Sequence, residues 1–145
     1  MDARPIGVFD SGLGGLTAVK QLEQVLPGES IVYFGDTGRV PYGSRGRELV
    51  RRYARQDMEF LLSQNVKAVL AACGTVSSVA RDIGEALPVP YLDVIWPCAQ
   101  AAAAATKTGR IGVIGTAATI HSDSYRSALL GINHKLQVFP QACPL

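Results

Sequence analysis

The chain has 145 residues, of which 48% are hydrophobic and 18% are charged, and its formal net charge is +2. This composition excludes an intrinsically disordered chain and suits one ordinary core-forming domain. The densest positive cluster, five arginines between residues 45 and 55, is accompanied at helical spacing by Glu48, Asp57 and Glu59. We interpret this cluster as a solvated helix face and expect no nucleic acid partner, because such binding needs a concentrated basic patch.

The cysteines and the hydropathy exclude further classes of protein. Cys73, Cys98 and Cys143 are odd in number and have no C-x-x-C spacing, which argues against a disulfide framework and a zinc site. His121 and His134 are isolated, so we expect no metal. No apolar run approaches the ~20 residues of a membrane span, and the start M-D-A-R-P does not resemble a signal peptide. These features predict a protein of the reducing cytoplasm with no membrane partner.

The first predicted unit is a strand over residues 6–9, a glycine-rich turn and a helix over residues 16–26. Asp10 and Ser11 follow the strand directly, before G-L-G-G. The turn lacks the third glycine of G-x-G-x-x-G and a following Walker lysine, so it is better suited to a small ligand than to a nucleotide phosphate. Asp10 is a candidate ligand contact because ligands of α/β sheets bind at the carboxyl ends of strands. The alternative is that Asp10 is a turn or helix-capping residue.

A long loop follows the second predicted strand. The strand covers residues 30–34, and the loop, residues 35–46, contains four glycines and one proline. Loops of this length in compact domains are usually functional, and Pro41-Tyr42-Gly43 could present backbone N–H groups to a carboxylate. An amphipathic helix is predicted next, over residues 47–64. Its expected inward residues are Leu49, Tyr53, Met58, Leu61 and Leu62.

The central stretch of the chain is K-A-V-L-A-A-C-G-T-V-S-S, residues 67–78. Residues 68–72 are wholly apolar, which predicts a strand buried on both faces. Cys73 ends this strand, Gly74 allows a turn, and the hydroxyls from Thr75 onward suit the start of a helix. A thiol in this position faces the ligand crevice and a helix N-terminus, which would favour the thiolate. The alternative is an inert, buried structural cysteine.

The rest of the chain continues the alternation of helix and strand. We expect helices over residues 76–87, 98–106 and from 122 or 123 to 130, and strands over residues 89–95, 110–114 and 135–139. This alternation predicts an α/β fold with a doubly wound parallel sheet. The segments I-G-V-F-D-S-G-L-G-G and I-G-V-I-G-T-A-A-T echo each other. We therefore predict a first α/β domain over residues 1–95 and the beginning of a similar second domain over residues 96–145.

Four ordered motifs carry a resemblance to a known family. They are D-S-G-L-G-G at 10–15, Y-F-G-D-T-G-R-V-P-Y-G at 33–43, A-A-C-G-T at 71–75 and G-V-I-G-T-A-A-T-I at 112–120. Together they resemble the glutamate racemases of the aspartate/glutamate racemase superfamily. The resemblance implies a cofactor-independent enzyme that interconverts L- and D-glutamate by two-thiol proton transfer and supplies D-glutamate for peptidoglycan. It also implies a small-molecule substrate, glutamate, and a possible homodimer.

The resemblance also implies roles for particular residues. Cys73 matches the first catalytic thiol, and Asp10 matches an assisting catalytic residue. The positions that match substrate-binding residues are Asp10, Ser11, Tyr42, Gly43, Gly74, Thr75, Thr116 and Thr119.

Two departures from the family pattern leave alternatives open. Gly74 stands where the family usually has asparagine, which removes amide donors and an acceptor from the site. The second catalytic cysteine of the family lies in a G-C-T-H-type motif that this sequence does not contain. We therefore expect the front part of a longer racemase. The alternatives are a catalytically incomplete module that binds a small dicarboxylate, a sister racemase acting on aspartate, and Cys98 as the second thiol.

Overall fold

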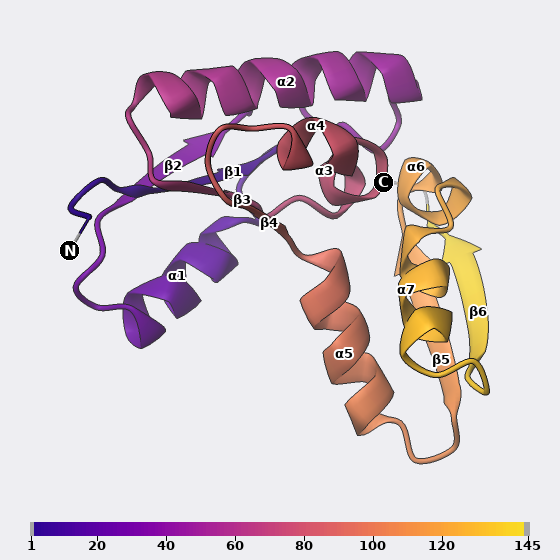
Figure 1. Cartoon of the computed structure of the whole chain (residues 1–145). Coiled ribbons are helices and arrows are strands. Elements are labelled where there is room, and N and C mark those ends of the chain that lie inside the picture. The colour runs from indigo at the N-terminus through magenta and orange to yellow at the C-terminus, as the bar shows by residue number, and fades with distance from the viewer. Residues whose placement is uncertain (1, 144–145) are drawn as a thin grey trace.

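The computed structural model describes residues 2–143, which form two lobes (Figure 1). The first lobe contains a four-stranded parallel sheet in the order β2-β1-β3-β4. Its strands are β1 (Ile6–Asp10), β2 (Ile31–Gly35), β3 (Ala68–Ala71) and β4 (Tyr91–Asp93). The predicted α/β fold with a parallel sheet is thus confirmed.

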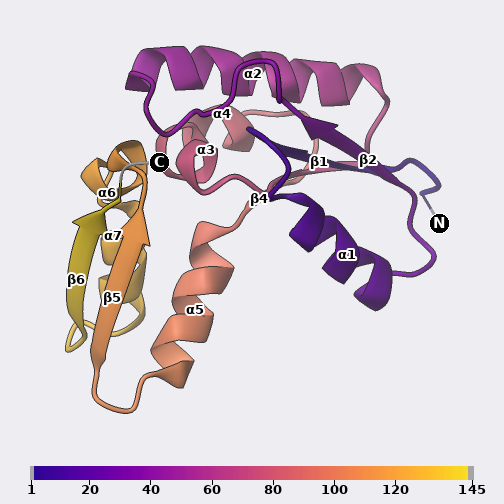
Figure 2. The same cartoon turned by 180° about the vertical axis from the view of Figure 1, so that it is seen from behind.

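Helices cover both faces of this sheet, as a doubly wound fold requires. Helix α1 (Leu16–Val25) lies on one face, whereas α2 (Arg47–Ser63), α3 (Gly74–Val79) and α4 (Arg81–Glu85) lie on the other (Figures 1 and 2). The core forms between the sheet and α2, where Phe9, Val69, Ala54, Met58 and Leu61 are fully buried. Burying such side chains contributes roughly 1.5–3 kcal/mol each, so this face holds the lobe together.

The second lobe contains a two-stranded parallel sheet. It consists of α5 (Ile95–Ala105), β5 (Arg110–Gly115), α6 (Ala117–His121), α7 (Ser124–Ile132) and β6 (Gln137–Ala142), and β5 pairs with β6. Helices α5 and α7 pack together and enclose a small core around Ala99, Leu129 and Leu136. Burial alternates along β5, because its odd-numbered side chains, such as Ile111 and Val113, face these helices.

Several element boundaries differ from the prediction. The strand expected over residues 89–95 is limited to Tyr91–Asp93, because Asp93 Oδ1 accepts a hydrogen bond from the Ile95 amide (2.9 Å) and α5 begins there. The helix expected over residues 76–87 is interrupted at Ala80, which leaves α3 and α4. Residues 117–121 form an additional helix, α6, and the last strand lies later than expected, at Gln137–Ala142. None of the helices in residues 2–143 has the length and apolar character to cross a membrane.

Candidate active site

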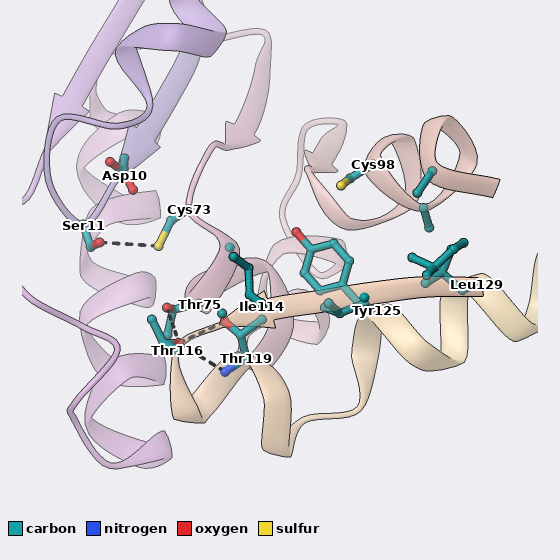
Figure 3. Close-up of a pocket in the computed structure, with 17 residues that line it drawn as sticks. Asp10, Ser11, Cys73, Thr75, Cys98, Ile114, Thr116, Thr119, Tyr125 and Leu129 are labelled. Atoms are coloured by element: carbon teal, nitrogen blue, oxygen red, sulfur yellow. Dashed lines mark hydrogen bonds between the residues drawn. The ribbon is translucent and has the colours of Figure 1, made fainter. Parts of the chain in front are cut away.

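The sheet order places a topological switch point between β1 and β3. From β1 the chain crosses to β2 on one side, and from β3 it crosses to β4 on the other. Asp10 ends β1, and Cys73 follows the neighbouring β3, so the two residues meet at the carboxyl edge where α/β sheets bind ligands. A cavity of about 470 Å³ opens there between the two lobes (Figure 3). This volume is ample for an amino acid.

Asp10 is held rigidly at the base of the cavity. Its side chain is buried, and Oδ2 accepts a hydrogen bond from the Gly15 amide at the start of α1 (3.0 Å). A Cβ atom at Gly15 would lie 2.8 Å from Asp10 Cβ, so only glycine allows this approach of the turn to the carboxylate. Asp10 therefore presents a fixed negative charge to the cavity.

Cys73 is buried, with only 4% of its surface exposed. Its thiol donates a hydrogen bond to Ser11 Oγ (3.5 Å, Figure 3). Burial raises the pKa of the Cys73 thiol, and the charge of Asp10 raises the pKa further, whereas the contact with Ser11 lowers it. The expectation that the helix N-terminus favours a thiolate is therefore wrong. Desolvation is the largest cause, and it outweighs the hydrogen bonds with Ser11 and with the Val76 backbone, which lower the pKa.

Three threonine hydroxyls from both lobes form a chain beside the thiol. Thr75 Oγ1 lies 3.1 Å from Thr116 Oγ1, which lies 3.0 Å from Thr119 Oγ1 (Figure 3). Thr116 also caps α6 by accepting from the Thr119 amide. All three residues line the cavity. The three threonines therefore add hydroxyl groups, each able to donate or accept a hydrogen bond, to the lining of the cavity.

Gly74 and Cys98 also line the cavity. A Cβ atom at Gly74 would meet only the Tyr125 hydroxyl oxygen, at 3.9 Å, and the backbone of Gly74 is not in the left-handed region. The position consequently has room for a side chain. Cys98 is exposed and comes from α5, whereas Cys143 is exposed and does not line the cavity.

Tyr42 and Gly43 differ from the other predicted site residues, because neither lines this cavity. The Tyr42 side chain is buried in the first lobe, with 1% of its surface exposed. Gly43 lies behind Thr116: a Cβ atom there would be only 2.2 Å from Thr116 Cγ2. The Tyr42 side chain is thus a buried core residue rather than a surface of the cavity.

The Tyr42 hydroxyl belongs to a buried polar cluster that the sequence pattern does not predict. It contacts Asp36 Oδ2 and lies 2.8 Å from Asp57 Oδ2. The Arg39 guanidinium bridges the same carboxylates, with Nε 2.5 Å from Asp36 Oδ2 and Nη2 2.8 Å from Asp57 Oδ1. We call Asp36, Arg39, Tyr42 and Asp57 the anchor cluster.

Asp57 does not lie on a solvated helix face, so the prediction made for it from the sequence is wrong. Its side chain is fully buried. The other buried residues of α2 are Val50, Ala54, Met58 and Leu61, and Asp57 falls on the same face, three residues after Ala54 and seven after Val50. The spacing alone would have predicted that Asp57 is buried, but its charge favoured the prediction of an exposed residue.

The anchor cluster gives a prediction for the pH dependence of stability. Burial, together with the charge of Asp36, raises the pKa of Asp57 from 3.8 to about 6, although Tyr42 and Arg39 oppose this. Between these pH values the folded chain binds more protons at Asp57 than the unfolded chain does. The free energy of unfolding should therefore fall as the pH rises from about 4 to above 6, by up to about 3 kcal/mol from this residue.

The measurement is urea unfolding of the wild type and Asp57→Asn across that pH range. Asparagine cannot titrate, so the fall assigned to Asp57 should be missing from the variant. An equal fall in both proteins would contradict the assignment, because other carboxyl groups are common to both.

The residues 2–143 contain no group of three or more His, Cys, Asp or Glu side chains placed to hold a metal ion. Among the residues that line the cavity, Asp10 is the carboxylate, and none is Lys, Arg or His. An anionic ligand in this cavity would therefore meet neutral donors, the hydroxyls and the backbone amides.

Comparisons with known proteins identify relatives over the whole described chain. The family described as Asp/Glu/Hydantoin racemase matches residues 6–143. Glutamate racemases from Chlorobaculum tepidum and Syntrophus aciditrophicus are 51% and 52% identical to the chain, covering 97% and 99% of it. The matches cover 53% and 54% of those relatives, so the chain spans about half of their length.

Solved structures agree with these sequence matches. The crystal structure of glutamate racemase from Francisella tularensis in complex with D-glutamate matches all of this chain with a TM-score of 0.91 and 44% identity. A glutamate racemase isoform from Bacillus anthracis matches 99% of the chain with a TM-score of 0.94 and 43% identity. In both cases the match covers 55% of the other chain.

Proposed function

The chain belongs to the Asp/Glu/hydantoin racemase family, and we propose that it forms part of a glutamate racemase in which Cys73 is one of two acid–base thiols. The observation that carries this proposal is the placement of Cys73, Asp10 and Ser11 at one switch point, facing a cavity that suits an amino acid. Two relatives that are 51% and 52% identical to the chain are named glutamate racemase.

The proposed reaction moves one proton off the α-carbon and another onto its opposite face. The Cys73 thiolate removes the proton, and the electron pair of the C–H bond passes onto the α-carbon and its carboxylate. A second thiol then gives its proton to the other face and keeps the S–H electron pair. A raised thiol pKa makes the Cys73 thiolate a stronger base, which reduces the mismatch with the weakly acidic Cα–H.

Charge distribution in the cavity supports an amino dicarboxylate as the ligand. Asp10 supplies a fixed carboxylate for an ammonium group, and its charge would repel a substrate carboxylate placed beside it. The hydroxyls of Ser11, Thr75, Thr116 and Thr119 offer neutral hydrogen bonds to the carboxylates. Fixed dipoles of this kind stabilise the charge that develops on the carboxylate during proton removal. In this proposal the loop at Tyr42 and Gly43, which does not line the cavity, acts through the contact of Gly43 with Thr116.

The test of the proposal is circular dichroism of L-glutamate with the complete protein, the polypeptide of about twice this length that the relatives represent. We expect the ellipticity to decay to zero as D-glutamate accumulates. Decay with L-aspartate but not with L-glutamate would instead identify a sister racemase. Binding of glutamate by the 145-residue chain without turnover would be the behaviour of the dicarboxylate-binding module.

The remaining expectations belong to the same proposal. They are a division into domains at residues 1–95 and 96–145, a cytoplasmic location, a supply of D-glutamate for peptidoglycan, and a homodimer of the complete enzyme. No cofactor is needed for the proposed proton transfers.

A prediction at Gly74 tests the substrate contact at that position. Gly74→Asn in the complete enzyme should lower KM for glutamate several-fold, because an amide hydrogen bond contributes about 0.5–1.5 kcal/mol. The free space at Gly74 and its ordinary backbone conformation should let the variant fold. Gly74→Ala is the matched control, since it adds the Cβ atom without the amide. Equal kinetics for the two variants would mean that position 74 does not contact substrate.

A further inference from the structure

The loop over residues 36–46 has few buried attachments to the rest of the protein. Most of its residues are exposed, and the side chains of Asp36 and Tyr42 are the two that are buried. Both belong to the anchor cluster, whose fourth member, Asp57, comes from α2. The tip of the loop is therefore tied to the first lobe through the buried Tyr42 ring and through the hydrogen bonds of the Tyr42 hydroxyl and the Arg39 guanidinium.

The same loop contacts the second lobe at Gly43. The backbone of Gly43 approaches Thr116 so closely that no Cβ atom fits between them. Thr116 is the middle member of the threonine chain, with hydroxyl contacts to Thr75 and Thr119. A displacement of the loop would consequently move or release the central hydroxyl of the cavity wall.

We propose that the anchor cluster is a positioning device: it fixes residues 36–46 so that Gly43 holds Thr116, and with it the hydroxyls of Thr75 and Thr119, against the cavity. The expected effect of the cluster on kcat/KM rests on the proposed function, whereas its expected effect on the position of Thr116 does not. Tyr42 is on this account a positioning residue that acts through Gly43 and Thr116.

The composition of the cluster favours positioning over stability. It buries two carboxyl groups with one guanidinium, and such groups are costly to desolvate unless every polar atom is satisfied. The Tyr42 hydroxyl has one hydrogen but two carboxyl neighbours, so both contacts are hydrogen bonds only when one carboxyl group holds a proton. A network of this kind tolerates few arrangements, and it therefore specifies one loop conformation.

The aromatic neighbour provides a matched control. The centroid of the Tyr53 ring lies 5.4 Å from that of the Tyr42 ring, and the Arg39 guanidinium lies 4.3 Å from the centroid of the Tyr53 ring. Within residues 2–143 the Tyr53 hydroxyl has no hydrogen bond to the anchor cluster. Tyr42→Phe and Tyr53→Phe thus remove the same atom from adjacent rings, once from inside the network and once from outside it.

The first measurement is methyl NMR of the complete protein, with Thr116 as the reporter. Tyr42→Phe should shift or broaden the Thr116 methyl resonance, and Tyr53→Phe should leave it in place. Val69→Ala, a core substitution in β3, controls for a general loss of stability. If Tyr42→Phe and Val69→Ala lower the melting temperature equally and neither moves Thr116, the cluster is merely structural and the proposal is wrong.

The second measurement is the kinetics of the complete protein. Tyr42→Phe should lower kcat/KM about tenfold to a hundredfold, as expected when a binding group is displaced by about 1 Å. If Tyr42→Phe does not fold, the pair Asp57→Asn and Asp57→Ala replaces it. Asparagine can still accept from Arg39 and donate to Tyr42, so the Thr116 resonance should be kept in Asp57→Asn and lost in Asp57→Ala.

The two proposals can fail separately. A wild-type protein that does not turn over glutamate would remove the proposed function, and the Thr116 resonance would still decide the positioning role. Turnover in the wild type, with unchanged kinetics and an unchanged Thr116 resonance in Tyr42→Phe, would overturn the positioning role alone.

Discussion

In the proposed glutamate racemase, Cys73→Ser is expected to reduce kcat for glutamate racemisation by on the order of 10³-fold or more. Serine keeps the shape of the side chain and can still contact Ser11, but its hydroxyl gives up a proton far less readily than a thiol does. KM should change little, because the hydroxyls and amides that we assign to substrate binding are untouched. The measurement is the decay of ellipticity from L-glutamate and, separately, from D-glutamate.

The other cysteines give this experiment its controls. Cys143→Ser should behave as the wild type, because Cys143 is exposed and away from the cavity. Cys98→Ser tests the alternative that Cys98 is the second thiol, since Cys98 lines the same cavity. A loss as large as that of Cys73→Ser would support this alternative. Retention of more than about a tenth of the activity by Cys73→Ser would contradict the acid–base role of Cys73.

The second large effect is expected from Gly43→Ala. The added Cβ atom would lie 2.2 Å from Thr116 Cγ2 and 2.6 Å from Thr116 Cβ, so either the loop or the start of α6 must move. Overpacking of this kind costs about 1–3 kcal/mol of folding free energy. Because the contact joins the two lobes beside the cavity, we expect kcat/KM to fall by roughly 10²-fold as well.

Gly38 provides the comparison within the same loop. A Cβ atom there would meet nothing within 4 Å, so Gly38→Ala should leave both stability and kinetics almost unchanged. Urea unfolding and racemisation assays of the two variants measure the effects. Similar results for Gly38→Ala and Gly43→Ala would show that the contact of Gly43 with Thr116 is not tight in solution.

The location of the site was predictable from the sequence because it depends on strand ends. Asp10 and Cys73 each follow an apolar run, and parallel strands bring their carboxyl ends to one edge whatever the loops do. Thr75 and Thr116 follow from the same argument, since each lies within three residues of the end of a predicted strand, and Thr119 comes three residues after Thr116. Their grouping around one cavity needs only the fold.

The states and directions of particular side chains were not predictable in this way. The Tyr42 side chain lies in a loop, and its direction depends on Asp57, which is 15 residues away in the sequence. The pKa of Cys73 depends on how deeply the thiol is buried by the surrounding core, whereas the sequence indicates only the adjacent helix start. The interruption at Ala80 was likewise not predicted, and the start of α5 at Ile95 depends on the direction of the Asp93 side chain, which accepts from the Ile95 amide.

The hydroxyl contacts between the lobes have a mechanical consequence. Two hydroxyl hydrogen bonds join α3 to the second lobe, one between Thr75 and Thr116 and one between Ser78 and Ser124 (3.0 Å). Ala118 of the second lobe packs against the core of the first. Water can replace either hydroxyl partner with little loss of enthalpy. We therefore expect the lobes to separate and close about the start of α5, an opening that also releases the contacts of Ala118 with the first core and of Gly43 with Thr116. Racemisation yields a product of the same size and charge as its substrate, and such a joint allows either enantiomer to leave.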